Sequence, residues 1–271
     1  MKKICRVLGI SRQGYYKSSK NKGRKKLSEE MVIKLVQSHR IKMPNIGGKK
    51  LYKLISPDLK KMKIDVGRDK FFSILRRNGL LIKRKKLYAK TTNSSHRFWV
   101  YDNLTIGLEP MGKNEIFVSD ITYIRLEDSF MYLALTTDLY SRKIVGYDLS
   151  DSLNLEGSLR ALKMSIKGKK KKDLKGLIHH SDRGFQYCSN PYTKLLIKKK
   201  MKISMSEKGN PYENAVAERV NGILKSEFML GETFKSKEDA SRAVKEAIET
   251  YNEYRPHMSI DYMTPNQKYA A

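Results

Sequence analysis

Two acidic residues lie within or at the end of apolar segments, where a carboxylate is unusual unless it has a specific role. Asp120 lies within an apolar run, "IFVSDITYI" (116–124), that predicts a central β-strand. A charge inside such a strand costs free energy unless it is paired or binds a metal ion. Asp182 ends a second short apolar strand, "GLIHHSD" (176–182), and the chain then turns at an Arg-Gly pair. Asp182 is therefore either a turn residue or a metal ligand.

A third acid, Glu218, lies on a predicted helix, "NAVAERVNGILKSEF" (214–228). Helical spacing separates an apolar side from a polar side that carries Asn214, Glu218, Asn221 and Lys225. Taken alone, Glu218 is a solvated helix residue and Asp182 is the cap of a turn. Taken together with Asp120, and with 35 residues between Asp182 and Glu218, the three acids favour a shared site.

Four further side chains are candidates for contact with DNA. His180 and Arg183 flank Asp182 and either orient the site or contact a phosphate, or they only support the structure. Asn214 belongs to the site or caps the helix. Lys225 follows Glu218 by seven residues, about two helical turns, so both side chains project from one side, about 10 Å apart along the axis. That position suits a phosphate contact, or else Lys225 is solvated.

The distribution of charge indicates a polyanionic partner. The chain has 271 residues and a formal net charge of +28. Residues 1–110 contain 29 basic and 7 acidic residues, a net charge of +22, whereas residues 111–271 contain 27 and 21, a net charge of +6. Nucleic acid is the expected partner. A membrane surface is the rival, but no apolar run reaches the length of a spanning helix. We expect a cytoplasmic protein.

The basic part predicts short helices. Residues 1–26 predict a leader with two short helices around Gly9 and Ser11, either a helix-turn-helix or a packing segment, which ends in a basic linker at 21–26. Residues 27–82 predict a basic helical DNA-binding domain, winged-helix or helix-turn-helix in type, with helices at 27–40, 49–55 and 68–77. Residues 83–110 form a basic linker whose aromatic residues contact bases or dock onto the next domain.

Residues 111–271 predict an α/β catalytic core. Strands at 114–125, 130–140 and 141–151 are separated by short gaps, as in an antiparallel meander. Two further strands are predicted at 176–182 and 202–206, and helices are predicted at 155–166, 191–199, 212–230 and 237–254. The first two helices alternate with these strands and the last two follow them. An exposed lysine loop is predicted at 169–172. This order predicts a mixed five-stranded sheet covered by helices.

Four motifs resemble the catalytic frame of bacterial insertion-sequence transposases of the OrfB type, whose catalytic domain is similar to retroviral integrase. They are "VSDITYI" (118–124), "HHSDRGFQY" (179–187), "KGNPYENAVAERVNGILKSEF" (208–228) and "YNEYRPHMSIDYMTPNQKY" (251–269). The resemblance extends to "LGISRQGYYK" (8–17) and "ILRRNGLLIKRKK" (74–86), so it covers nearly the whole chain. The separation of 35 residues is that of the family. One departure is Glu213-Asn214, where the family often has Asp-Asn.

The resemblance implies a ribonuclease-H-like fold and an Asp-Asp-Glu triad, here Asp120, Asp182 and Glu218, that binds two Mg²⁺ or Mn²⁺ ions. The implied activity is phosphodiester hydrolysis and strand transfer, with water or a DNA 3′-hydroxyl as nucleophile. The implied partners are the element's terminal inverted repeats, target DNA, further copies of the chain and an upstream-frame partner or fusion. Lys225 matches the basic residue of the family motif. Two cysteines without zinc spacing imply no structural zinc.

Two other functions remain open. A DNA-binding protein with a silent triad would act as a repressor or persist as an inactive remnant. A metal-dependent nuclease would cleave DNA without strand transfer. A serine or tyrosine recombinase is disfavoured, because the many tyrosines have no supporting Arg-His constellation.

Overall fold

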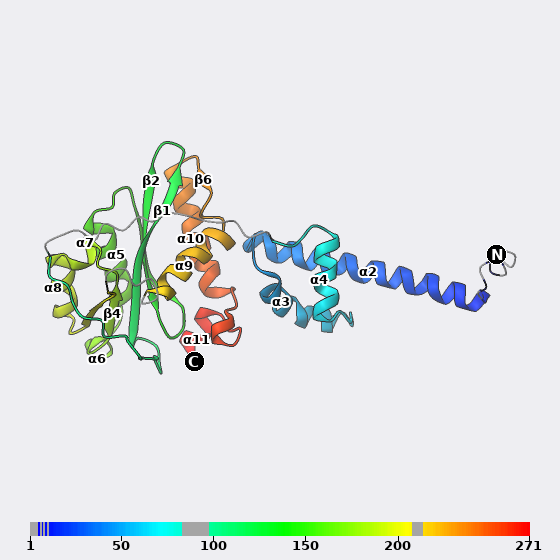
Figure 1. Cartoon of the computed structure of the whole chain (residues 1–271), viewed down its shortest axis with the longest axis horizontal. Coiled ribbons are helices and arrows are strands. Elements are labelled where there is room, and N and C mark those ends of the chain that lie inside the picture. Colours follow the sequence, from blue (N-terminus) through cyan, green and yellow to red (C-terminus); the bar gives the residue numbers. More distant parts are fainter. Residues whose placement is uncertain (1–4, 6, 8, 10, 83–97, 208–213) are drawn as a thin grey trace. The chain divides into compact units, whose positions relative to one another are not determined.

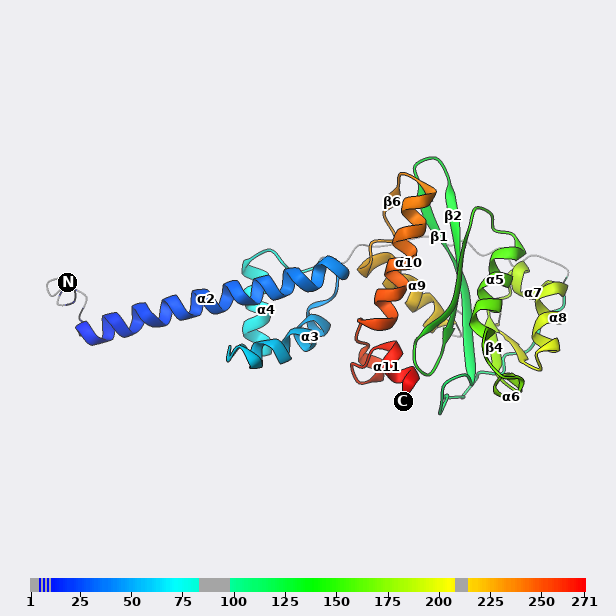
Figure 2. The ribbon, with the colours of Figure 1, turned by 180° about the vertical axis from the view of Figure 1, so that it is seen from behind.

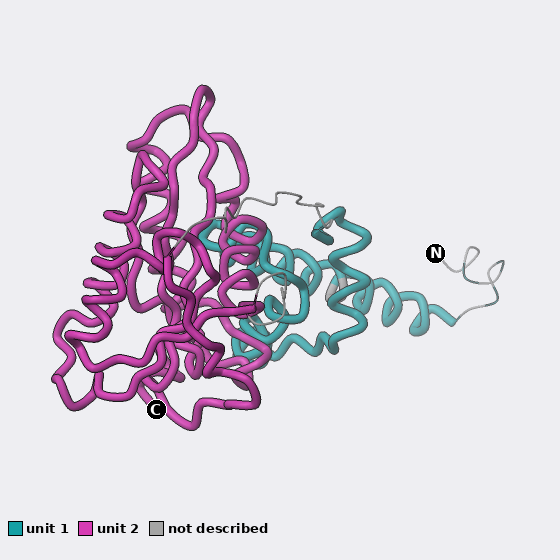
Figure 3. Tube along the Cα trace, turned by 60° about the vertical axis from the view of Figure 1, so that its left-hand side comes forward, with its two compact units in different colours: residues 1–83 teal, residues 84–271 magenta. Residues whose placement is uncertain are grey.

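A computed structural model describes residues 5, 7, 9, 11–82, 98–207 and 214–271 of the chain. The chain divides into two compact units, Met1–Lys83 and Arg84–Ala271 (Figure 3). Within the described part of the chain, no helix has both the length and the apolar character needed to cross a membrane. The predicted linker residues 83–97 lie outside the described residues.

Among its described residues, the first unit contains the helices α2 (Arg12–Lys42), α3 (Gly48–Lys61) and α4 (Arg68–Arg77) (Figure 1). The helix predicted at 68–77 is confirmed residue for residue. Each helix contributes apolar side chains to a small core, which includes Val32, Val36, Leu51, Ile55, Phe71 and Leu75. The lysine and arginine side chains of this unit are mostly left outside that core.

Helix α2 corrects two predictions about the leader. Residues 12–42 form one continuous helix, so the second leader helix is much longer than predicted and the irregular linker at 21–26 was wrong. Ser11 caps the helix by accepting a hydrogen bond from the Gly14 amide at 2.9 Å. The helix continues because residues 12–42 contain no proline, Lys and Arg have good helix propensity, and Gly23 costs only about 1 kcal/mol.

Helix α3 also runs further than predicted, since it continues from the expected end at Ile55 to Lys61. Pro57 lies inside this helix, where its missing amide hydrogen disfavours helical structure. Leu51, Ile55 and Leu59 recur at intervals of four and are all buried. The burial of Leu59 on this face offsets the unfavourable proline.

The second unit is built on a mixed sheet with the strand order β3-β2-β1-β4-β5. The strands are β1 (Ile116–Leu126), β2 (Phe130–Asp138), β3 (Ile144–Ser150), β4 (Ile178–Ser181) and β5 (Lys202–Met205). The first three strands are antiparallel, and β4 and β5 run parallel to β1. All five predicted strands are therefore confirmed. A sixth strand of two residues, β6 (Thr233–Phe234), pairs with the end of β1 and was not predicted.

Helices cover both faces of this sheet (Figures 1 and 2). One face carries α5 (Leu155–Ile166), α7 (Phe185–Cys188) and α8 (Asn190–Lys198). The other face carries α9 (Ala215–Glu227) and α10 (Lys237–Glu253). The described residues also form α6 (Lys171–Leu174), η1 (Met258–Ile260) and α11 (Pro265–Ala270). Helix α6 overlaps the lysine loop predicted at 169–172, so residues 171 and 172 are helical and not loop.

Strand β1 packs against both layers because its side chains alternate. Phe117 joins the core under α5 and α8, while Ile116 and Val118 pack with Ala217 of α9. The helix predicted at 212–230 ends at Glu227, and Met229 takes a left-handed φ of 62°. Its expected first residues, 212 and 213, lie outside the described residues.

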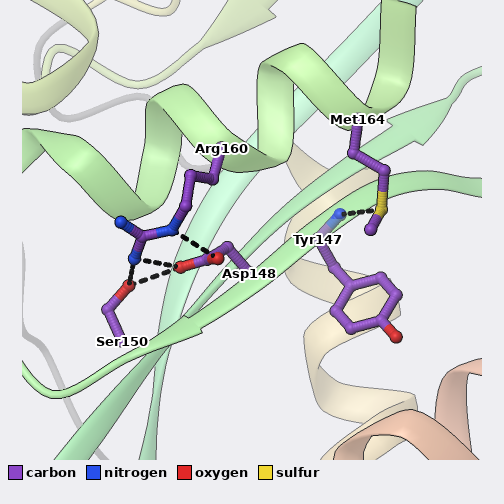
Figure 4. A network of polar contacts seen from close by, with 5 residues as sticks. All are labelled: Tyr147, Asp148, Ser150, Arg160 and Met164. Atoms are coloured by element: carbon purple, nitrogen blue, oxygen red, sulfur yellow. Dashed lines mark hydrogen bonds and ion pairs between the residues drawn. The ribbon is translucent and has the colours of Figure 1, made fainter. Parts of the chain in front are cut away.

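A polar network fixes α5 on β3 (Figure 4). The Arg160 guanidinium donates to both carboxylate oxygens of Asp148, at 2.7 and 2.8 Å, and to Ser150 Oγ at 3.0 Å. The Tyr147 amide donates to Met164 Sδ at 3.4 Å. These contacts hold the outer strand against its helix and leave the central strands β1 and β4 to carry the predicted site.

Candidate active site

The sheet brings two of the predicted acids together. Strands β1 and β4 are parallel neighbours, and Ser119 is the register partner of Ser181. Asp120 follows Ser119 and Asp182 follows Ser181 in the sequence. They therefore lie side by side, with β4 ending just before Asp182 and β1 continuing through Asp120.

Asp120 is held by two donors. The Ile121 amide donates to Oδ1 at 2.9 Å, and the Asn221 side-chain amide donates to Oδ2 at 2.7 Å. Burial, followed by the charge of Asp182, raises the pKa of Asp120 to about 7, with a smaller contribution from Glu218. The two hydrogen bonds act in the opposite direction because they stabilise the ionised carboxylate. The two hydrogen bonds therefore stabilise the ionised form of Asp120 only in part.

Asp182 stabilises a turn and is also one of the three candidate site residues. Its Oδ1 accepts a hydrogen bond from the Gly184 amide at 2.9 Å, as in an Asx-turn. A Cβ atom on Gly184 would lie 2.9 Å from the same oxygen, so glycine leaves room for this turn. The turn fixes the direction of the carboxylate, and the role of Asp182 as a metal ligand stays a prediction.

Glu218 lies in the first turn of α9 and is exposed. Burial and the charge of Asp182 raise its pKa. The three predicted acids therefore influence one another electrostatically. Within the described residues, however, no three His, Cys, Asp or Glu side chains stand close enough together to hold a metal ion.

Lys225 is half-buried on α9. Burial lowers the pKa of its ammonium group, and the negative charge of Asp120 acts in the opposite direction. Lys225 therefore lies within the electrostatic reach of the site, as its position seven residues after Glu218 predicts. Its contact with DNA stays a prediction.

The other predicted DNA contacts all have partners inside the protein. Arg183 Nε donates to the Ser206 carbonyl oxygen at 2.7 Å. His180 is fully buried, with its Nδ1 atom 2.9 Å from Ser204 Oγ. Asn214 is 6% exposed, and its side-chain amide donates to the Ser119 carbonyl oxygen at 3.2 Å. Asn214 stands at the start of α9 but its side chain does not cap the helix.

Asn221 was not among the predicted site residues, although it contacts Asp120 directly. The available signal was its position three residues after Glu218 on the polar side of the same helix. It was insufficient because helical spacing identifies a face but not its partner. Asn221 links α9 to β1 across 101 residues of sequence.

A buried polar cluster lies behind the site, on the opposite face of β1 and β4. His179 Nε2 is 3.0 Å from Ser119 Oγ and 2.9 Å from the Tyr192 hydroxyl. Burial, together with the neighbouring His180, lowers the pKa of His179 to about 3, so the imidazole is neutral. The cluster ties β1, β4 and α8 together without adding charge next to Asp120.

The sheet order and the helices on both faces define a ribonuclease-H-like core of the integrase type, which confirms the predicted fold. Two models of the family described as "Integrase core domain" match residues 110–211 and 199–265. Both matches fall within the second unit.

Similar proteins cover nearly the whole chain. An uncharacterized 31 kDa protein of insertion element IS600 from Shigella sonnei is 33% identical, over 97% of this chain and 96% of its own. The transposase InsF for insertion sequence IS3A from Escherichia coli is 29% identical, over 98% and 93%. Among solved structures, the catalytic core domain of HTLV-2 integrase in complex with magnesium is 18% identical with a TM-score of 0.47, over 59% of this chain and 99% of that one.

The chain belongs to the bacterial insertion-sequence transposases with an integrase core domain. It is a DNA transposase, and its activity is that of a polynucleotidyl transferase.

Proposed function

We propose that Asp120, Asp182 and Glu218 are the metal ligands with which this transposase hydrolyses phosphodiester bonds and transfers strands at the ends of its mobile element. The observation that carries the proposal is the pairing of β1 with β4, in which Asp120 and Asp182 follow the registered residues Ser119 and Ser181. Glu218 joins them because its charge contributes, after burial and the charge of Asp182, to the raised pKa of Asp120.

The donor chemistry of these residues fits divalent metal ions. Carboxylate oxygens are the ligands that Mg²⁺ and Mn²⁺ prefer, and accumulated negative charge is what a cation neutralises. After burial, which is the largest cause, the charges of Asp182 and Glu218 both contribute to the raised pKa of Asp120. Two bound Mg²⁺ or Mn²⁺ ions would polarise the attacking and leaving oxygens of the reacting phosphate.

The protein's own residues orient the site. Asn221 and the Ile121 amide each hold one oxygen of the Asp120 carboxylate. The Gly184 amide holds Asp182. Lys225, on the same helix as Glu218, supplies a positive charge that suits a DNA phosphate beside the reacting bond.

The proposed partners are the element's terminal inverted repeats and the target DNA. We assign sequence-independent DNA binding to residues 27–82, with residues 1–26 as a helical extension, 83–110 as a linker and 111–271 as the catalytic core. A homo-oligomer on DNA and an upstream-frame partner or fusion complete the proposed assembly.

The proposal is tested with Asp120→Asn, Asp182→Asn and Glu218→Gln in the full chain. Each change should lower cleavage and strand transfer by about 10³-fold or more, because residues that act as a unit fail together. The assay uses duplexes carrying the ends of the element and either Mg²⁺ or Mn²⁺. DNA binding measured in EDTA should remain nearly unchanged.

The matched controls are Asp128→Asn and Glu156→Gln, which change exposed acids of the same unit. Both should retain full activity. Full strand transfer by any one of the three ligand variants would remove that residue from the site.

A further inference from the structure

Three lysine side chains from distant parts of the sequence surround one tyrosine ring. Lys113 precedes β1, Lys143 precedes β3, Lys169 follows α5, and Tyr269 lies on α11. The ammonium nitrogens of Lys113, Lys143 and Lys169 lie 5.6, 4.5 and 5.4 Å from the centre of the Tyr269 ring. We call these three residues the lysine cluster.

Hydrogen bonds fix two of the three ammonium groups. Lys113 Nζ donates to the Tyr269 carbonyl oxygen at 2.8 Å, and Lys169 Nζ donates to the Tyr269 hydroxyl at 2.7 Å. That hydroxyl in turn donates to Asn114 Oδ1 at 2.8 Å. The positions of these charges are therefore set by contacts with neutral groups, in advance of any ligand.

The lysine cluster concentrates positive charge without an acidic partner. Across the ion pairs between described residues, none includes Lys113, Lys143 or Lys169. The electron-rich face of Tyr269 compensates the charge of each ammonium group only in part. Lys268 adds a fourth ammonium group nearby on α11, 4.2 Å from the centre of the Tyr140 ring. Such a concentration of like charge attracts an anion.

The position of the lysine cluster suits the backbone of a DNA duplex. Asn114 precedes Asp120 by six residues, and only residues 116–120 of this stretch belong to β1, so the two residues are at most about 20 Å apart at the rise of a strand. Phosphates along one DNA strand repeat about every 3.4 Å of the helix axis. The Asn114 end of the lysine cluster therefore lies within about six nucleotides of a phosphate at Asp120.

We propose that the lysine cluster binds backbone phosphates of a DNA duplex within about six nucleotides of the reacting bond. This contact extends the DNA-binding surface of the transposase into its catalytic unit. It also gives a role to the end of the chain, because Tyr269 of α11 is the residue that gathers the three lysines. The DNA is either the element's own end or the target, since both present the same phosphates.

The test compares two triple variants of the full chain that remove equal charge. One carries Lys113→Gln, Lys143→Gln and Lys169→Gln in the lysine cluster. The control carries Lys163→Gln, Lys198→Gln and Lys245→Gln, three exposed lysines of α5, α8 and α10. Binding is measured over a series of salt concentrations in EDTA, so the result is independent of the proposed metal ligands.

Each lost phosphate contact lowers the slope of log affinity against log salt by about 0.9 for duplex DNA. The magnitude of this slope should be smaller by about 2–3 for the cluster variant than for the wild type, and by less than about 1 for the control variant. Two probes, a duplex carrying an element end and a duplex of unrelated sequence, identify the source. A loss with the end duplex alone assigns the cluster to the element's end, and a loss with both assigns it to DNA of any sequence.

Equal slopes for the two triple variants would overturn the proposal. So would a cluster variant with a lower melting temperature and an unchanged slope, because the lysines would then only pack against Tyr269. If the triple variant does not fold, Lys143→Gln replaces it, because within the described residues its ammonium group contacts only the ring. This single change should lower the slope by about 1.

Discussion

The carboxyl group of Asp120 binds a proton more readily in the folded chain than in the unfolded chain. Burial and the charge of Asp182 raise its pKa from 3.8 to about 7. Folding is therefore favoured by this group below pH 3.8, and that contribution is lost as the pH rises through 7. In EDTA, the metal-free protein should become less stable across this window, because ionised Asp120 has no cation beside it.

Asp120→Asn should remove this dependence on pH. The difference in unfolding free energy between the variant and the wild type should grow by about 2 kcal/mol between pH 5 and pH 8, in favour of the variant. Urea unfolding in EDTA measures it, with the exposed Asp128→Asn as control. Asn221→Ala should move the window to higher pH, because Asn221 lowers the pKa of Asp120. A difference that stays constant with pH would contradict the charge assignment.

At the scale of the elements, one segment fastens α9 and β3 together. This clamp segment, residues 251–257, begins in α10 and ends before η1. The Tyr251 hydroxyl donates to the Arg142 carbonyl oxygen at 2.9 Å. Asn252 bonds both the amide and the carbonyl of Ile144, at 3.0 and 2.9 Å. Arg255, which is 2% exposed, donates to both oxygens of Glu227 at 2.9 and 3.0 Å.

The ion pair of the clamp segment should contribute strongly to stability. Glu227→Gln leaves the Arg255 charge buried without its partner and should destabilise the chain by about 3–5 kcal/mol. The double change Glu227→Gln with Arg255→Met should recover part of this loss, because it removes the unpaired charge. Urea unfolding of the cycle measures the coupling. Asp239→Asn, which breaks an exposed pair with Arg242, should change stability by less than about 1 kcal/mol. If the loss of the Arg255–Glu227 pair and the loss of the Arg242–Asp239 pair lowered the unfolding free energy equally, burial would not explain the strength of the first pair.

At the scale of the whole molecule, most of the net positive charge and the candidate active site lie in different parts of the chain. The net charge is +22 over residues 1–110 and +6 over the rest, while the candidate active site lies entirely in the second unit. Helices α2, α3 and α4 bury a small apolar core in the first unit and leave most of its basic side chains exposed. We therefore expect the basic residues of the N-terminal part to supply attraction to DNA that does not depend on sequence.

A fragment of residues 1–100 should bind duplex DNA by itself, with an affinity that falls steeply as salt rises, because neutralised phosphates release counterions. Fluorescence anisotropy at several salt concentrations measures it. The comparison fragment, residues 101–271, should bind more weakly and with a shallower salt dependence. A folded 1–100 fragment that binds no better than 101–271 would show that the charge does not serve DNA binding.

Local pattern was sufficient for most elements and for the identity of the acids. Alternating apolar residues predict the five main strands, and helix signals predict α4 and α5 to the residue. Asp120 stands out because a charge inside an apolar strand has few explanations. Local pattern failed for α2, where basic composition was taken as a linker although lysine and arginine favour helices.

Only the tertiary structure decided which residues meet. The pairing of β1 with β4 places Asp182 beside Asp120, and the packing of α9 on β1 makes Asn221 its donor. The lysine cluster and the clamp segment likewise join residues that are from 28 to 156 positions apart. Periodicity along a chain reports which face of an element is buried, but it carries no information on the neighbour of that face. Strand order and helix packing supply that information, because burying both faces of β1 fixes what lies against each of them.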